Sequence, residues 1–193
     1  MKRYLQYFLF VLIADGICCS GDVRAQTDVP EATHVIMPNG FFAEGEWDDA
    51  SKVDVEDGIK VYAKQDERHL YVAICAQDTA HTGLDLYIAT NAESQLLFHV
   101  SSAFASATCE NGEWSEWRWE QNRRWTANKI GLYHDGDKRC SSEPEGFEFQ
   151  ISKDMIHGEV VYVAFRLKRP PYEYPSEEDR EAFNNWIPFR IGK

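Results

Sequence analysis

The sequence predicts an all-β protein, a single antiparallel β-sandwich with one or two short helical turns. Short runs in which apolar and polar residues alternate recur along the chain, and this period of two is typical of half-buried strands. Turn residues separate the runs, and almost no stretch has the period of a helix. About eight to ten such strands, spaced roughly 8–15 residues apart, indicate two sheets packed on one core.

The first 25 residues are expected to be a secretory signal peptide. A basic start, Met1–Arg3, precedes the apolar run Tyr4–Ala14, and Val23–Ala25 offers small residues for cleavage after Ala25. A lipoprotein anchored through Cys18 or Cys19 is the alternative. No later segment approaches the ~20 apolar residues of a membrane helix, so the mature chain is expected to be secreted, or periplasmic and part of the cell envelope.

The mature chain is expected to be strongly acidic. The formal net charge is −12, and loss of residues 1–25 removes three basic and two acidic residues, which brings it to −13. Such a surface repels nucleic acid and anionic lipid, which argues against both partners. A disordered leader is expected over 26–33, followed by one domain over 34–193. The oligomeric state is left open.

The hairpin over residues 58–78 is the clearest element. Alternating apolar residues in 59–63 and 70–74 flank the polar turn 65–68, and tyrosines on the opposite positions indicate that the second face is also covered. The loops are expected at 101–111 and 168–176, and short helical turns at 152–156 and 176–184. Further strands are expected at 84–88, 95–102, 123–133, 146–151, 159–167 and 186–191.

Three cysteines remain after removal of the leader, and none has metal or redox spacing. Cys75 lies within a predicted strand and is expected to be a buried small residue. Cys109 and Cys140 lie in irregular polar stretches, and export permits a disulfide between them. Free thiols at both positions are the alternative.

The order of these pieces resembles the family 9-like carbohydrate-binding modules of the DOMON-like group. Segments similar to that family's pattern cover nearly all of Val35–Ile191, and they are Glu46–Ala50, His69–Asp78, Leu84–Ile88, Arg124–Ala127, Phe147–Ser152, Val161–Arg166 and Trp186. The resemblance implies a jelly-roll-like sandwich that holds sugar chain ends between two tryptophans. It also implies that Trp186 forms one wall of the sugar site, with the amides of Asn184 and Asn185 nearby; a core role for Trp186 is the alternative.

No cofactor and no catalytic site are expected. Ala89–Thr90 stands where the family often has an aspartate, a departure from the residues of the family's calcium site, and calcium is left as the one possible cofactor. The six histidines lack metal-ligand spacing, and neither a Ser-His-Asp order nor a G-x-S-x-G elbow is present. The protein is therefore interpreted as a non-enzyme, at most an accessory to glycoside-degrading enzymes.

A cluster of tryptophans is the strongest functional feature. Exposed indoles suit sugars, because C–H faces of pyranose rings stack on π surfaces while flanking polar groups bind hydroxyls. If 114–119 is extended, Trp117 and Trp119 share one face and Trp114 points to the other. Trp125 is assigned to the core. The candidate ligand residues are Trp114, Glu116, Trp117, Arg118 and Trp119, with Asp78 at the end of the hairpin as a further contact.

Two functions follow from these features. The first is an exported, non-catalytic protein that binds a poly- or oligosaccharide by aromatic stacking and polar contacts. The second is a cell-envelope structural or protein-interaction module that keeps the sandwich without a sugar site, since an exposed aromatic strip also suits a protein partner.

Overall fold

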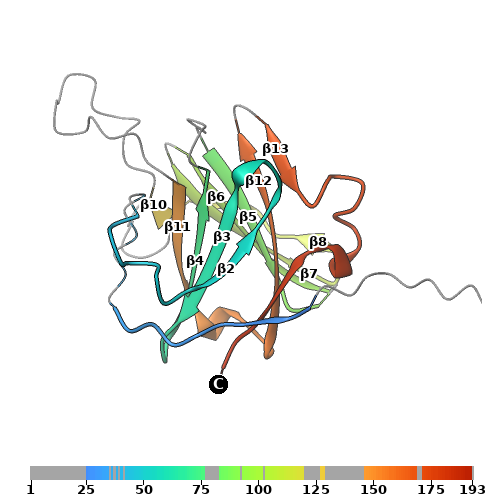
Figure 1. The fold of residues 1–193 in the computed structure, drawn as a ribbon. Helices are drawn as coiled ribbons and strands as arrows, with labels where there is room; N and C mark the ends of the chain where they lie inside the picture. The colour runs from blue at the N-terminus through green and yellow to red at the C-terminus, as the bar shows by residue number, and fades with distance from the viewer. Residues whose placement is uncertain are drawn as a thin grey trace, which may run out of the picture.

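Two β-sheets pack face to face in the computed structural model, which confirms the predicted fold class (Figure 1). The structure describes residues 25–34, 36, 38, 40, 42–76, 83–91, 93–101, 103–119, 127–128, 146–168 and 171–192.

The larger sheet has nine strands, and we call it the large sheet. Its neighbours are antiparallel except at one edge, where β1 pairs with β14 in parallel. The order is β1 (Thr27–Asp28), β14 (Ile187–Arg190), β12 (Val160–Lys168), β5 (Gly83–Ala89), β6 (Ser94–Val100), β7 (Phe104–Glu110) and β8 (Glu113–Trp114), with β13 (Tyr172–Tyr174) beside β12 and β9 (Arg118–Trp119) beside β7.

The small sheet has five antiparallel strands and contains the hairpin that the sequence predicted. Its order is β10 (Ala127–Asn128), β11 (Gly146–Ser152), β4 (His69–Cys75), β3 (Lys60–Gln65) and β2 (Ser51–Asp54). The described residues also form three 3₁₀ turns, one more than expected, namely η1 (Glu56–Gly58), η3 (Lys153–Met155) and η4 (Phe183–Asn185).

Alternate residues of both sheets meet in a single apolar core. In the small sheet, Val61 and Ala63 of β3 point inward with Leu70, Val72 and Ile74 of β4. The large sheet contributes every second residue of its central strands to this core, because successive side chains of a strand point to opposite faces. These are Leu84, Leu86, Ile88, Leu96, Phe98, Val161, Val163, Phe165 and Leu167, all buried.

The outer face of the small sheet is covered by the chain between residues 30 and 50. Trp47 packs there with Ile36 against Tyr71 and Ala73 of β4, as the tyrosines of the hairpin predicted. The indole N–H of Trp47 donates to Oε1 of the fully buried Glu148 over 2.8 Å. A sheet that is buried on both faces explains why β4 is apolar at nearly every position.

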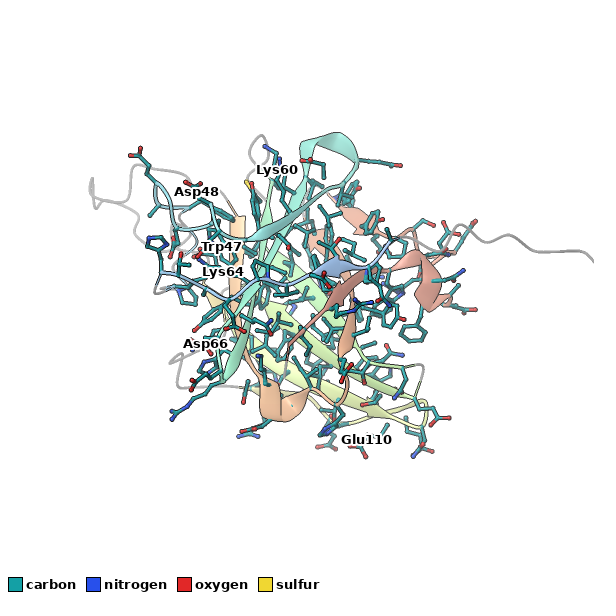
Figure 2. The ribbon with its side chains drawn as sticks, turned by 60° about the horizontal axis from the view of Figure 1, so that its bottom comes forward. Trp47, Asp48, Lys60, Lys64, Asp66 and Glu110 are labelled. Atoms are coloured by element: carbon teal, nitrogen blue, oxygen red, sulfur yellow. The ribbon has the colours of Figure 1, made fainter. Side chains whose placement is uncertain are left out.

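A buried lysine ties this covering segment to the sheet. Lys64 of β3 has no exposed side-chain surface; its Nζ donates to Oδ1 of Asp49 over 2.8 Å and to the carbonyl of Glu46. The ammonium also lies 5.3 Å from the ring centroid of Trp47, a cation–π distance. Figure 2 shows Trp47 and Lys64 together on this face, with Asp66 at the turn between β3 and β4.

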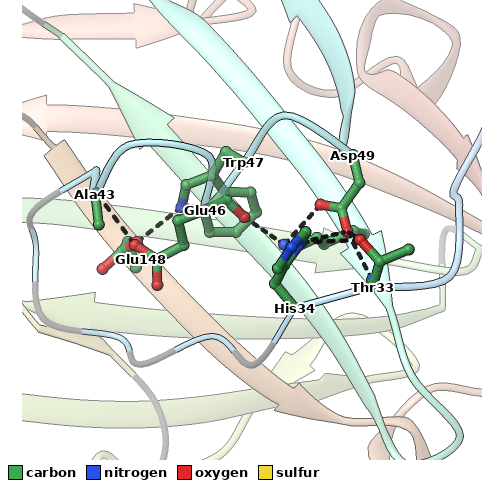
Figure 3. A network of polar contacts seen from close by, with 8 residues as sticks. Thr33, His34, Ala43, Glu46, Trp47, Asp49 and Glu148 are labelled. Atoms are coloured by element: carbon green, nitrogen blue, oxygen red, sulfur yellow. Dashed lines mark hydrogen bonds and ion pairs between the residues drawn. The ribbon is translucent and has the colours of Figure 1, made fainter.

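Asp49 is held in its ionised form by the same network (Figure 3). Burial by itself raises the pKa of Asp49, but hydrogen bonds from Lys64 and from the hydroxyl and N–H of Thr33 hold that pKa well below its ordinary value of 3.8. The ion pair is therefore maintained throughout the neutral range.

Three segments differ from the sequence prediction. Residues 26–33, expected as a disordered leader, contain β1, and Val29 is buried in the core. Residues 101–111, expected as a loop, contain β7; its outward residues are Ala105, Ala107 and Cys109, and its core-side residues beyond Phe104 are polar, so the usual apolar alternation is missing. Residues 168–176 contain β13, which pairs with β12 despite the neighbouring prolines.

Asp49→Asn should lower the free energy of unfolding by about 3 kcal/mol, the lower end of the cost of removing one partner from a buried ion pair, because the amide oxygen still accepts from Lys64. Urea denaturation at pH 7 measures this change. Asp48→Asn is the matched control, since Asp48 is exposed and its change should stay within about 0.5 kcal/mol.

The same pair of proteins gives a pH test. The pKa of Asp49 is depressed in the folded state, so its contribution is complete above the unfolded pKa near 3.8 and is lost as the pH falls below that value. The stability difference between wild type and Asp49→Asn must therefore shrink below about pH 4. A difference that stays constant down to pH 3 would contradict the assigned ion pair.

Candidate functional site

The outer face of the large sheet carries a groove. Strand register places Ala164, Tyr87, Leu97 and Ala107 in one row across β12, β5, β6 and β7, all on the face opposite the core. They point outward because their neighbours along each strand point into the core. Two of the four are alanines, so the middle of the sheet forms a low floor between larger side chains.

One wall of the groove comes from the segment between β13 and β14. Trp186 is only 2% exposed and packs on Ala89 and Ala164, with Phe183 at 4.9 Å and Tyr87 edge-on at 6.2 Å between ring centroids. Its indole N–H donates to the carbonyl of Arg180 over 2.8 Å. This bond fixes the backbone that carries Arg180 and Glu181 along the groove.

Hydrogen bonds at the start of this segment shape the wall. The N–H of Asp179 donates to Oγ of Ser176 over 3.3 Å, and the hydroxyl of Ser176 donates to the Asp179 carboxylate over 2.7 Å. Asp179 thus lies three residues after Ser176, the spacing of a capping box. The chain then forms turns and η4 instead of a regular α-helix.

The other wall is formed by tryptophans beyond β7. Trp114 and Trp117 are 46% and 45% exposed, and both border the groove. Trp114 lies beside Cys109 in the ladder between β7 and β8, on the same outer face as the floor. The groove holds about 390 Å³. Its lining residues are Tyr87, Gln95, Leu97, Ala107, Trp114, Ser115, Trp117, Arg180, Glu181, Phe183 and Trp186.

The expected facing of the tryptophans is wrong in one respect. Trp119 pairs with Ala105 and Trp114 pairs with Cys109, so both lie on the outer face. The alternation breaks between them because Ser115 binds back to Thr108, donating its N–H to the Thr108 carbonyl and accepting the Thr108 N–H on its hydroxyl. Residues 115–117 are consequently not extended strand.

Three of the nine candidate ligand residues line the groove, and they are Trp114, Trp117 and Trp186. Trp119 is 61% exposed on the same face but outside the lining. Four others are not part of the lining: Glu116 and Arg118 are exposed, Asn184 is exposed on η4, and Asn185 donates its amide to the carbonyl of Asp179. Asp78 lies outside the described residues, as does Trp125.

Sequence reasoning missed the polar and aromatic residues contributed by other elements. Tyr87, Gln95, Ser115, Arg180 and Glu181 border the groove, and no motif marked them. The period-two pattern of β5 and β6 already placed Tyr87 and Gln95 on outward positions. What the sequence did not reveal was which outward face stays uncovered.

Charged residues lie beside the groove in the next row of the sheet. Asp85 accepts from Nδ1 of His99 over 2.6 Å, and its other oxygen lies 2.8 Å from Nζ of Lys168. Burial raises the pKa of Asp85, but these hydrogen bonds outweigh it and leave that pKa below its ordinary value. His99 in turn lies edge-on to Trp117, with 6.1 Å between ring centroids.

The same histidine joins a serine to the aspartate. Nε2 of His99 lies 3.0 Å from Oγ of Ser101, so a Ser–His–Asp sequence of hydrogen bonds exists in space although the chain order did not indicate one. In serine hydrolases backbone N–H groups, often including that of the serine, stabilise the oxyanion. Here the N–H of Ser101 donates to the carbonyl of Ala103 and is therefore not available to an oxyanion. The Oγ of Ser101 accepts from the Ala103 N–H, so both bonds of Ser101 stabilise the turn between β6 and β7.

Cys75 and Cys109 are both buried. For Cys75 this agrees with the predicted buried strand residue. Cys140 lies outside the described residues, so the disulfide between Cys109 and Cys140 stays a prediction. Within the described ranges, no cluster of three or more His, Cys, Asp or Glu side chains is arranged to hold a metal ion. Nor does any helix in those ranges have the length and apolarity to cross a membrane.

Comparisons with known proteins give one structural likeness to report. No family model matches the sequence, and no curated protein matches it. Among solved structures, the chain is similar to a carbohydrate binding module of family 9 from Caldicellulosiruptor kristjanssonii, determined in complex with cellotriose. The alignment covers 86% of this chain and 93% of that chain at 9% identity, with a TM-score of 0.45.

Acrylamide quenching of tryptophan fluorescence tests the exposure of Trp119 and the burial of Trp186. Trp119→Phe should reduce the fraction of emission that acrylamide reaches, because this indole is 61% exposed. Trp186→Phe should raise that fraction, because it removes an emitter that is only 2% exposed. Acrylamide is neutral, so the acidic surface does not bias its access. Shifts in the same direction for both variants would contradict these placements.

Proposed function

We propose that this protein is an exported, non-catalytic carbohydrate-binding protein whose groove holds the end of a glycan chain. The observation that carries this proposal is the pair of aromatic walls. Trp114 and Trp117 stand on one side, Phe183 packed on the buried Trp186 stands on the other, and the floor between them includes Ala107. The proposed location is outside the cytoplasm, as the N-terminal sequence predicts.

A sugar ring suits this arrangement better than a purely apolar ligand does. The exposed indoles offer π surface for pyranose C–H groups, while Gln95, Ser115 and Glu181 provide donors and acceptors for hydroxyls. The volume of about 390 Å³ falls within the usual range of small-ligand sites. Few ligand atoms would be buried, so a dissociation constant of roughly 10⁻³–10⁻⁵ M is expected.

A protein-interaction module is the second candidate, and one observation favours it. Trp119 is 61% exposed, lies outside the groove and continues the aromatic surface of Trp114 and Trp117 along the edge of the sheet. Exposed aromatic surface of this kind is typical of docking sites as well. The two functions differ in which tryptophans they require.

Trp117→Ala and Trp114→Ala should each weaken oligosaccharide binding at least tenfold, corresponding to about 1.4 kcal/mol, because each removes stacking surface from a groove wall. A glycan array identifies a soluble ligand, and calorimetric titration then measures the dissociation constants. Trp119→Ala is the matched control: it removes the most exposed indole but no lining residue, and should change affinity less than twofold.

Two results would speak against the sugar groove. Absence of binding across a broad array of neutral and charged glycans would remove the proposal. If Trp119→Ala lowers oligosaccharide affinity as much as Trp117→Ala does, the binding surface includes the aromatic edge outside the groove. That result would favour the protein-interaction module.

A further inference from the structure

We propose that the groove is selective for acidic sugars and that Arg180 binds the carboxylate of a uronic acid residue. This inference rests on the proposed sugar-binding function and adds the chemical class of the ligand. It comes from the position of Arg180, the incomplete hydrogen bonding of its guanidinium and the distribution of charge beside the groove.

Arg180 is positioned as a wall residue with a fixed base. It borders the groove, and its Cζ lies 5.0 Å from the ring centroid of Tyr87 on the floor. The bond from the Trp186 indole to the Arg180 carbonyl, and the bond from the Arg180 N–H to the Ser176 carbonyl, hold its backbone. A guanidinium stacked on an aromatic ring keeps its N–H edge available for a planar anion.

The guanidinium is incompletely hydrogen-bonded. Its Nη1 is a buried nitrogen without a hydrogen-bond partner among the described residues, and it lies 3.5 Å from Oε2 of Glu173. Glu173 already binds Nε of Arg166 through its other oxygen. Oε2 of Glu173 also lacks a hydrogen-bond partner among the described residues, so the two side chains meet only as a long ion pair. A ligand carboxylate would supply hydrogen bonds that this ion pair does not.

Cations share two carboxylates beside the groove. Arg166 and Arg180 share the single carboxylate of Glu173, and Lys168 shares Asp85 with His99. Three permanent cations thus face two carboxylates. Glu181 also borders the groove, but it is exposed to solvent, which screens its charge.

This local charge contrasts with the whole chain, whose formal net charge is −12. The Debye length is about 8 Å at 0.15 M salt, so distant acids are screened and the residues beside the groove decide the interaction with a ligand charge. A carboxylate matches the planar fork of a guanidinium. A uronic acid combines that carboxylate with the C–H faces that the tryptophans would stack on.

Matched ligands isolate the charge. Trigalacturonate and trimannuronate are each titrated calorimetrically against their own methyl esters in 150 mM NaCl, with cellotriose as a neutral reference. The wild-type protein should bind at least one acid about tenfold more tightly than its ester, and this ratio should fall towards one in 1 M NaCl because salt screens the interaction. The salt series uses the unmodified protein, so it does not depend on any variant folding.

Two variants assign the effect to Arg180. Arg180→Gln should bring the acid-to-ester ratio to within twofold of one while cellotriose affinity changes little, and urea denaturation confirms that the variant is folded. Glu181→Gln, the neighbouring groove residue of opposite charge, should raise the ratio.

The outcomes separate the two proposals. Esters or cellotriose that bind as tightly as the acids, with binding lost in Trp117→Ala, would overturn the acidic preference and leave the sugar groove standing. An undiminished acid preference in Arg180→Gln would also overturn this inference. Failure of acids, esters and cellotriose alike to bind would count against the proposed function and the inference together.

Discussion

The ion pair of Lys64 with Asp49 is the interaction that holds the covering segment on the outer face of the small sheet. An ammonium with no exposed surface is tolerated only where oxygens surround it, and Asp49 and the Glu46 carbonyl supply them from the segment that crosses the small sheet. The small sheet is thereby covered on both faces. Over the middle strands of the large sheet, the described residues leave the groove on the outer face.

The groove follows from how strands alternate and from which residues occupy the outward positions. Large side chains at Leu86 and Phe98 fill the core, while Ala107 and Ala164 leave room on the opposite face of the same sheet. The walls come from irregular segments at the two sides of this floor. Strands therefore provide the level surface and loops provide the specificity, a division of labour common in binding proteins.

The sequence was sufficient for the fold because most strands, such as β3, β4, β11 and β12, have strong apolar alternation. It was insufficient where that signal is weak: β7 turns alanines outward, and β13 lies among prolines. For the site, residue type identified Trp114 and Trp117, since indoles among charged residues are conspicuous. Tyr87 and Arg180 were missed because they approach these tryptophans only through the pairing of distant strands.

The wall that contains Trp186 and Arg180 has a kinetic consequence. It is anchored by β14, which pairs with β12 and, through Thr27 and Phe189, with the very first strand. Contacts between residues so far apart in the chain form slowly, because closing the long intervening loop costs entropy before the contacts can stabilise the fold. We therefore expect the groove to be among the last features to assemble.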